Sequence, residues 1–136
     1  MLVKSPAAPR RPTGRPSADL TNAIIHFLYT RGSYAWRASS QGTYDSKTAR
    51  YRTAAKKGVS DILAIIPPHG RTLAIEVKIG ADRLRPEQEG FLATIVHHGG
   101  LATVAKALPD FIAWYDANVA SAARAVELSS QSRRAA

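Results

Sequence analysis

A chain of 136 residues, 45% of them hydrophobic, can bury one sizeable core and is too short for two ordinary domains. Its 19 lysines and arginines exceed its 10 acidic residues, and the net charge of +9 favours nucleic acid as a partner, ahead of an anionic membrane surface. Because the chain has no cysteine, disulfides and thiolate metal sites are excluded, and a metal ion would need hard ligands of the kind that magnesium or manganese prefers.

The two ends differ in composition from the middle. Residues 1–16 hold four prolines, four basic residues and no acid, which predicts a flexible basic arm. Residues 121–136 are rich in alanine, serine and arginine and are expected to form a tail that extends a helix before fraying. A single domain is therefore expected over residues 17–120. No apolar run approaches the roughly 18 residues of a membrane span and the N-terminus lacks a signal-peptide pattern, so we expect a cytoplasmic protein without membrane contact.

The first half of the domain begins with an amphipathic helix. Apolar residues recur at helical spacing from Leu20 to Leu28, Ser17 can cap the start, and Arg31 and Gly32 end the helix. An aromatic-rich strand is predicted over residues 33–38. The next segment, 39–57, is polar and basic, and so long a connection is usually functional or disordered.

The second half alternates strands and helices. Two β-rich runs, 61–66 and 72–79, flank a Pro-Pro-His-Gly-Arg turn, which predicts an antiparallel hairpin. A helix starts at Pro86 and ends at Gly99 and Gly100. A short strand over 101–106 and a last helix from Pro109 complete the order helix, strand, strand, strand, helix, strand, helix.

The hairpin carries the residues with chemistry. Alternation along a strand places Glu76 and Lys78 on one face, and antiparallel pairing brings Asp61 near that end. Phosphodiester hydrolysis needs a deprotonated water, a charge clamp and stabilisation of the leaving oxygen, which a carboxylate-held magnesium supplies. The sequence leaves open whether Lys78 would orient or deprotonate the water or stabilise the phosphate charge.

Two further polar residues fit the same pocket. Gln88 lies on the otherwise apolar inward face of the helix from Pro86, so it needs a polar partner such as a water, a metal-bound group or Lys78. Asp19, near the start of the first helix, would add another acid, with stabilisation of the helix dipole as the alternative interpretation.

Four short segments, taken together, resemble a known family. They are Gly58 to Leu63 (GVSDIL), Ile75 to Lys78 (IEVK), Pro86 to Gln88 (PEQ) and the Gly99-Gly100 pair. In this order they look like the VRR-Nuc domain, the virus-type replication-repair nuclease branch of the PD-(D/E)XK superfamily, over about residues 17–116.

The resemblance implies an α/β fold with a restriction-endonuclease-like core, in which helices flank a mixed four-stranded sheet (αβββαβ). It also implies that Asp61, Glu76 and the Val77 carbonyl bind the metal and that Lys78 is the catalytic lysine. The family's helix glutamine falls on Gln88, and its first-helix acid, usually glutamate, falls on Asp19. Stand-alone members are similar to Holliday-junction resolvases, which implies a homodimer that acts on branched DNA.

Basic residues flank the expected site. The connection before Asp61 and the approach to the helix at Pro86 would contact phosphates, which position a duplex without reading its sequence. These predicted DNA-binding residues are Lys47, Arg50, Arg52, Lys56, Lys57, Arg83 and Arg85.

Other chemistry-bearing residues have ordinary interpretations. Histidines 26, 69, 97 and 98 give no spacing that argues for a ligand set. Trp36, Trp114 and Tyr115 are interpreted as core or interface residues rather than base-stacking surfaces.

The sequence therefore predicts a Mg²⁺- or Mn²⁺-dependent DNA endonuclease that selects branched or structured DNA. Taken singly, each site residue has a structural explanation, such as a solvated Glu76–Lys78 ion pair; their order favours the nuclease. A sequence-specific restriction-type nuclease is the alternative enzyme, disfavoured because no separate recognition domain is present. A non-catalytic basic DNA-binding module is the alternative of another class, and magnesium-independent binding without cleavage would favour it.

Overall fold

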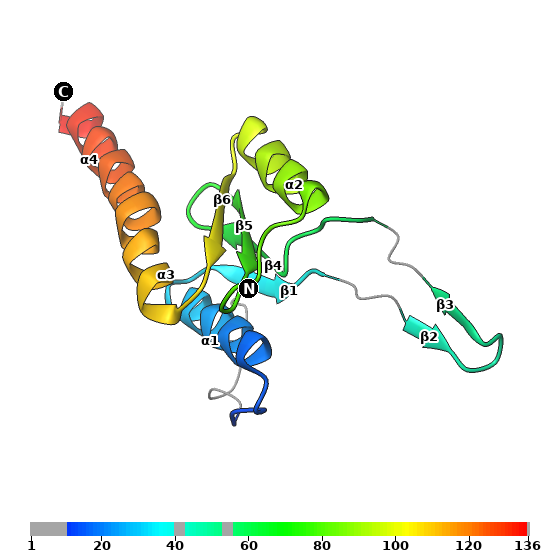
Figure 1. Ribbon diagram of the computed structural model, residues 1–136. Helices are drawn as coiled ribbons and strands as arrows, with labels where there is room; N and C mark the ends of the chain where they lie inside the picture. Colours follow the sequence, from blue (N-terminus) through cyan, green and yellow to red (C-terminus); the bar gives the residue numbers. More distant parts are fainter. Residues whose placement is uncertain (1–10, 40–42, 53–55, 136) are drawn as a thin grey trace.

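Four of the strands form one mixed sheet in the order β1-β4-β5-β6 (Figure 1). The computed structural model describes residues 11–39, 43–52 and 56–135. β1 (Tyr34–Arg37), β4 (Ile62–Ile66) and β5 (Arg71–Val77) are antiparallel neighbours, and β6 (Leu101–Ala105) pairs in parallel with β5. The parallel crossover from β5 to β6 runs through α2 (Pro86–His97), as is usual for such connections. The predicted α/β fold with a mixed four-stranded sheet is confirmed.

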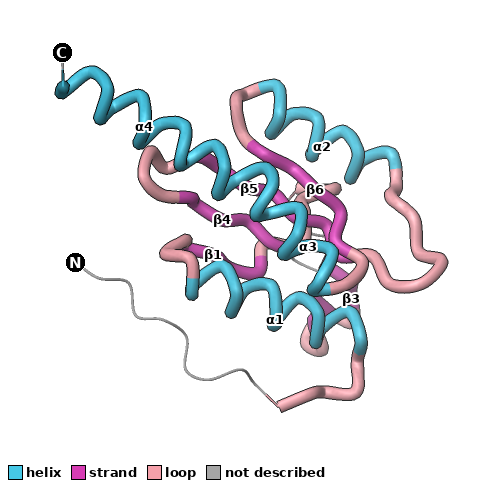
Figure 2. Tube along the Cα trace, turned by 90° about the vertical axis from the view of Figure 1, so that its left-hand side faces the viewer, coloured by secondary structure: helices cyan, strands magenta, loops and turns pink. Residues whose placement is uncertain are grey.

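One face of this sheet packs against α1 (Pro16–Thr30) and α3 (Leu108–Tyr115), which lie together on the same side in Figure 2. The core forms here because the apolar positions of α1 recur at helical spacing and meet alternate residues of the strands. Its fully or almost fully buried members are Leu20, Ile24, Leu28, Ile62, Ala64, Ile66, Leu73, Ile75, Phe111 and Tyr115. This face is therefore a continuous apolar core.

The opposite face is only partly covered. Within the described residues α2 contacts β5 and β6 but neither β4 nor β1, so the outer side of those two strands has no helix over it. The turn from α2 into β6 depends on Gly100, where an added Cβ would lie 2.6 Å from a methyl of Ile95 and 2.9 Å from the Thr72 carbonyl. Glycine at this position lets α2 lie close to β5.

The polar connection contains a small hairpin that the sequence did not predict. β2 (Thr43–Asp45) and β3 (Arg50–Arg52) form a two-stranded antiparallel sheet of their own. Among the described residues these strands contact only each other, and Figure 1 shows them extending away from the four-stranded sheet. The strands were missed because each has only three residues, too few to establish the alternation that marks a half-buried strand.

The C-terminal segment is helical. α3 continues through a π-helical turn over residues Asp116–Ala120 into α4 (Ser121–Ala135), where the sequence predicted a tail that extends a helix. No helix in the described ranges is both long and apolar enough to cross a membrane. Most of the predicted basic arm, residues 1–10, lies outside the described residues.

Candidate active site

Asp61 lies where the ladder between β4 and β5 ends. Its carbonyl accepts a hydrogen bond from the Ala38 amide (2.9 Å), which ties it to the end of β1. Its Oδ2 accepts from the Val77 amide (2.8 Å) and its Oδ1 from the Ser39 hydroxyl (3.2 Å). The Asp61 side chain thus takes the place of a backbone partner for Val77 and is held in a fixed position beside the end of β5.

Glu76 is the buried member of the pair, with only 2% of its surface exposed. The register pairs Ile62 with Ile75, so Asp61 and Glu76 are opposite each other one position further along the ladder. Burial and the nearby Asp61 carboxylate raise the pKa of Glu76 from its ordinary value of 4.5 to about 7. Asp61 and Glu76 therefore lie close together and form the centre of the site.

Gln88 fixes the orientation of Glu76. Its Nε2 donates to Glu76 Oε1 (2.8 Å), and its Oε1 accepts from the Arg85 amide (2.9 Å) at the start of α2. The sequence required a polar partner for this inward-facing amide, and the structure identifies Glu76 and the Arg85 backbone as its partners. Gln88 therefore links the first turn of α2 to the carboxylate pair.

Lys78 is also buried, with 6% of its surface exposed. Its amide donates to the Ala105 carbonyl (3.0 Å), while its Nζ lies 3.8 Å from Glu76 Oε1 and 3.6 Å from Asp82 Oδ2. Both separations exceed the usual range of an N–H···O hydrogen bond. The ammonium of Lys78 therefore lies beside Glu76 without a short hydrogen bond to Glu76 or Asp82. It could contact a phosphate without first breaking such a bond.

The loop before Asp61 is packed tightly against α2. Gly58 has a positive φ of 82°, and a Cβ at this position would overlap the backbone carbonyl of Glu87. Ser60 is fully buried and its hydroxyl donates to the Ile62 carbonyl (2.9 Å). Glycine and serine in this segment therefore allow Asp61 and the first turn of α2, which carries Gln88, to come together.

The donor set fits a hard divalent cation. Among the described residues Glu76 Oε2 is buried without a hydrogen-bond partner, and the Asp61 carboxylate lies beside it. The Val77 amide points toward Asp61, and the carbonyl of a strand residue points to the same side as its amide. Two carboxylates and one backbone carbonyl are an ordinary protein contribution to a magnesium site, which usually keeps several waters.

The structure does not bring Asp19 into this group. Its Oδ1 accepts from the backbone amide and the hydroxyl of Thr13 (2.8 Å each), and these bonds lower the pKa of Asp19. In the described part of the chain no three histidine, aspartate or glutamate side chains gather as a metal-ligand group. Asp19 instead receives the hydrogen bonds of the segment that leads into α1, a role that its position near a helix N-terminus favours.

The predicted DNA-binding residues lie on two stretches of the chain, one before Asp61 and one between β5 and α2. Lys47 is in the turn of the β2–β3 hairpin and Arg50 begins β3, and both side chains are exposed; the side chain of Arg52 lies outside the described part. Lys56 and Lys57 are exposed in the segment that leads to Asp61, and Arg83 and Arg85 are exposed before α2. These positive charges therefore lie on the chain segments that precede Asp61 and follow Glu76.

Sequence reasoning missed two side chains of the site. Ser39 binds Asp61 and Asp82 pairs with Lys78, and both residues are in irregular segments. The only sequence signal was the spacing of four between Lys78 and Asp82, which has no fixed meaning outside a helix.

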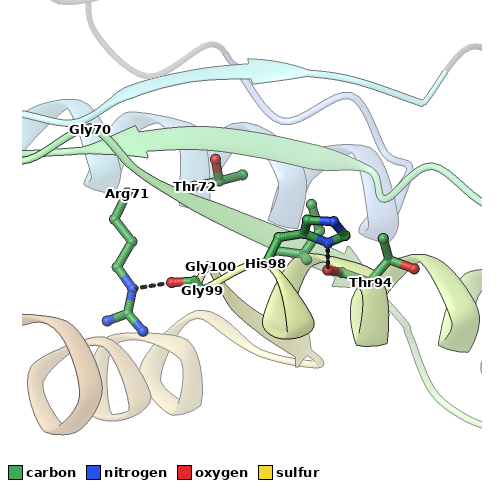
Figure 3. Close-up of a pocket in the computed structure, with 8 residues that line it drawn as sticks. Gly70, Arg71, Thr72, Thr94, His98, Gly99 and Gly100 are labelled. Carbon is green, nitrogen blue, oxygen red and sulfur yellow. Dashed lines mark hydrogen bonds between the residues drawn. The ribbon is translucent and has the colours of Figure 1, made fainter.

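A separate depression lies at the opposite end of β5 (Figure 3). It has a volume of about 250 Å³ and is lined by Gly70, Arg71, Thr72, Thr94, Ile95, His98, Gly99 and Gly100. In it the Arg71 Nε donates to the Gly99 carbonyl (2.7 Å), and His98 Nδ1 lies 2.8 Å from the Thr94 carbonyl. Because no carboxylate lines it, this depression lacks the chemistry of the Asp61–Glu76 centre.

A mixed sheet that presents two carboxylates and a lysine at one end, beneath a helix that supplies a glutamine, defines a restriction-endonuclease-like α/β protein. The VRR-NUC domain profile matches residues 36–108, which is more than half of the chain. The chain therefore belongs to the VRR-NUC domain family, a family of nucleases.

Comparison of folds agrees with this assignment. A solved structure described as a VRR-NUC domain is similar at a TM-score of 0.57 with 14% sequence identity, covering 76% of this chain and 97% of that chain. At this identity the likeness concerns the fold alone. No curated protein matches the chain.

Proposed function

We propose that this protein is a divalent-metal-dependent endonuclease that hydrolyses the phosphodiester backbone of DNA. The observation that supports this most is the buried Oε2 of Glu76, which has no hydrogen-bond partner among the described residues and lies beside a second carboxylate. Leaving a buried carboxylate oxygen without a partner is costly, and a bound cation removes that cost. The ligands would be Asp61, Glu76 and the carbonyl of Val77, and the ion Mg²⁺ or Mn²⁺.

Bound there, a divalent ion supplies a Lewis acid for the phosphate and lowers the pKa of a coordinated water. The chain's own residues do the rest. Gln88 holds Glu76 in one orientation through its 2.8 Å hydrogen bond, and the Val77 amide does the same for Asp61. Lys78 places an ammonium beside the pair, where it stabilises the negative charge that grows on the phosphate.

DNA as the substrate is supported by charge. The chain carries a net charge of +9, and exposed lysines and arginines flank the carboxylate pair in the sequence segments on both sides. These side chains would neutralise phosphates and position the backbone over the site. Selection of branched or otherwise structured DNA is the finer part of the proposal and follows from the likeness to junction-cutting members of the family.

A homodimer is part of the same proposal. Two copies would bring two cleavage sites to one branched substrate. An apolar groove of about 560 Å³ between α2 and the edge strand β6, lined by Leu92, Val96, His97 and Val104 among others, supports it as the contact surface. Val96, which is 54% exposed, leaves apolar surface uncovered at this groove. A mass of one chain in sedimentation at working concentration would contradict this part.

The direct test is cleavage of labelled four-way junction, flap, duplex and single-stranded DNA with Mg²⁺, Mn²⁺ or EDTA. Wild type is compared with Asp61→Ala and Lys78→Ala, and Leu128→Ala, an exposed residue of α4, is the matched control. We expect metal-dependent cutting that the two site variants lose and the control keeps. Binding of DNA without cleavage under every condition would instead identify a non-catalytic module, and cutting at one fixed sequence a restriction-type enzyme.

A further inference from the structure

Large apolar side chains are exposed at five places in the described part of the chain, and three of these lie together. They are Tyr34 (46% exposed), Trp36 (38%), Ile65 (43%), Val96 (54%) and Leu128 (66%). The first three share the open side of β1 and β4, because Tyr34 is the direct cross-strand partner of Ile65 and Trp36 is two positions further along β1. Of the two interpretations given to Trp36, core or interface residue, its 38% exposure contradicts the first.

The aromatic rings of this open face are already arranged against one another. The Tyr34 and Trp36 ring centroids are 5.6 Å apart with an interplanar angle of 45°. The ring of Tyr29, at the end of α1, packs edge-on against the ring of Tyr34, with 6.2 Å between the ring centroids. Because these ring contacts already restrict Tyr34 and Trp36, less rotamer freedom is lost when a ligand contacts them.

The open face is continuous with the carboxylate pair. Leu63 is the partner of Trp36, and Asp61 is two residues before Leu63, so Trp36 and Asp61 are diagonal neighbours at roughly 7–8 Å. Alternation along β5 also puts Glu76 on this side of the sheet, because its neighbours Ile75 and Val77 face the core. A distance of this size corresponds to about two nucleotides of a DNA strand.

We propose that Tyr34 and Trp36 stack against unpaired bases of the DNA strand whose backbone lies at the Asp61–Glu76 pair. This inference rests on the proposed nuclease function and narrows it. Inside a duplex, neighbouring bases stack on both faces of every base and leave none free for a side chain. Only flaps, junction arms, bulges or single strands offer an unstacked base to Tyr34 and Trp36. The enzyme would thus select substrates with unpaired nucleotides next to the bond that is cut.

Nucleic acid fits this face better than a second copy of the chain does. The three exposed side chains offer roughly 300 Å² in all, well below the roughly 800 Å² per partner of a stable protein interface. A DNA strand is also complementary to the net charge of +9 that the chain carries. The exposed Lys56 and Lys57 lie in the segment that leads into Asp61.

The test measures binding in EDTA, so that no cleavage intervenes. Three DNAs are compared: a blunt duplex, the same duplex with a short thymidine overhang, and the same duplex with an overhang of abasic sites. Wild type should bind the thymidine overhang about 5-fold to 100-fold more tightly than the abasic one for each base that stacks. Trp36→Ala should lower this preference by the roughly 5-fold or more that one stacked base contributes and leave binding of the blunt duplex unchanged.

Two further variants separate stacking from a structural role. Trp36→Phe should keep most of the preference because it keeps a flat ring, and Leu128→Ala, which removes an exposed apolar side chain on α4, should keep all of it. The emission of Trp36 should also be quenched by the thymidine overhang and not by the abasic one, measured in Trp114→Phe, since the chain has two tryptophans.

Other outcomes would overturn the inference. Equal losses of affinity in Trp36→Ala for all three DNAs would mean a general structural effect. If wild type sediments as a dimer and Trp36→Ala as a monomer, with the preference for bases unchanged, the face would be assigned to contact with a second copy. If wild type cuts DNA but Trp36→Ala keeps the full preference for the thymidine overhang, only this inference fails. If wild type shows the base preference and cuts nothing, the inference stands and the nuclease proposal fails.

Discussion

On the side of the sheet that α1 and α3 cover, β4 presents Ile62, Ala64 and Ile66, all buried and apolar. On the other side, β5 presents the buried Glu76, one of whose oxygens has no hydrogen-bond partner among the described residues. No described helix covers β1 and β4 on that side. The first side stabilises the fold. The second contains buried charge, which costs stability and is retained where it serves a site. Substitutions on the two sides should therefore affect different measurements.

The largest effect is expected in the core. Phe111 is 2% exposed and packs against Phe27, Trp114 and Tyr115. Phe111→Ala should lower the free energy of unfolding by about 3–5 kcal/mol, because it leaves a cavity that the two helices cannot close. Trp36→Ala, on the open side, should cost less than about 1 kcal/mol. Urea unfolding followed by circular dichroism measures both, and equal losses would contradict the division between the two sides.

The next effect is on catalysis. Lys78→Ala should slow single-turnover cleavage by about 10²–10³-fold, because it removes the positive charge beside the reacting phosphate. DNA affinity in EDTA should change little, since Lys78 is 6% exposed and not part of the exposed basic segments. A Lys78→Ala protein that cuts at the wild-type rate would remove this residue from the mechanism.

A smaller effect concerns the cost of the buried acid. Because the pKa of Glu76 is raised to about 7, the metal-free folded protein favours the protonated acid below that pH. Its contribution to stability is fully present below the ordinary pKa of 4.5 and is lost as the pH rises through about 7. Glu76→Gln resembles the protonated form, so near pH 8 it should raise the free energy of unfolding by on the order of 1 kcal/mol.

Urea unfolding in EDTA at several pH values tests this prediction. The advantage of Glu76→Gln should shrink as the pH falls toward 5, where wild type is itself protonated. A variant that is less stable than wild type near pH 8 would show that the carboxylate is stabilised by partners and not strained by burial.

The smallest effect concerns the exposed charges. Lys56→Ala/Lys57→Ala should reduce the slope of log binding constant against log salt by up to about two, one for each lost phosphate contact. The control is Arg133→Ala/Arg134→Ala, which removes the same charge at the exposed end of α4. Equal changes of slope in both variants would indicate that overall charge, and not this segment, determines binding.

Regular patterns in the sequence predicted most of the fold. The helical spacing from Leu20 to Leu28 predicted α1, and the two β-rich runs about the Pro-Pro turn predicted the antiparallel β4–β5 hairpin. The antiparallel pairing is why Asp61, Glu76 and Lys78 were expected to converge. The β2–β3 hairpin was missed because each of its strands has only three residues and contacts no other described element.

Contacts of the site that depend on irregular segments were not predictable. Nothing in the sequence indicates that Ser39 binds Asp61 or that Asp82 pairs with Lys78. Asp19 was expected near the metal from its place in the first helix, but Thr13 engages its carboxylate. Trp36 is a large aromatic residue of the kind that usually lies in a core, and it is exposed because no described helix covers the outer side of β1.

The central claim is that the Asp61–Glu76 pair binds a divalent cation, and calorimetric titration with Mn²⁺ tests it without any assumption about the substrate. Near pH 8, wild type should bind Mn²⁺, Asp61→Asn and Glu76→Gln should lose this binding, and Asp19→Asn should keep it. Retention of wild-type affinity in both pair variants, or its loss in Asp19→Asn, would contradict the account.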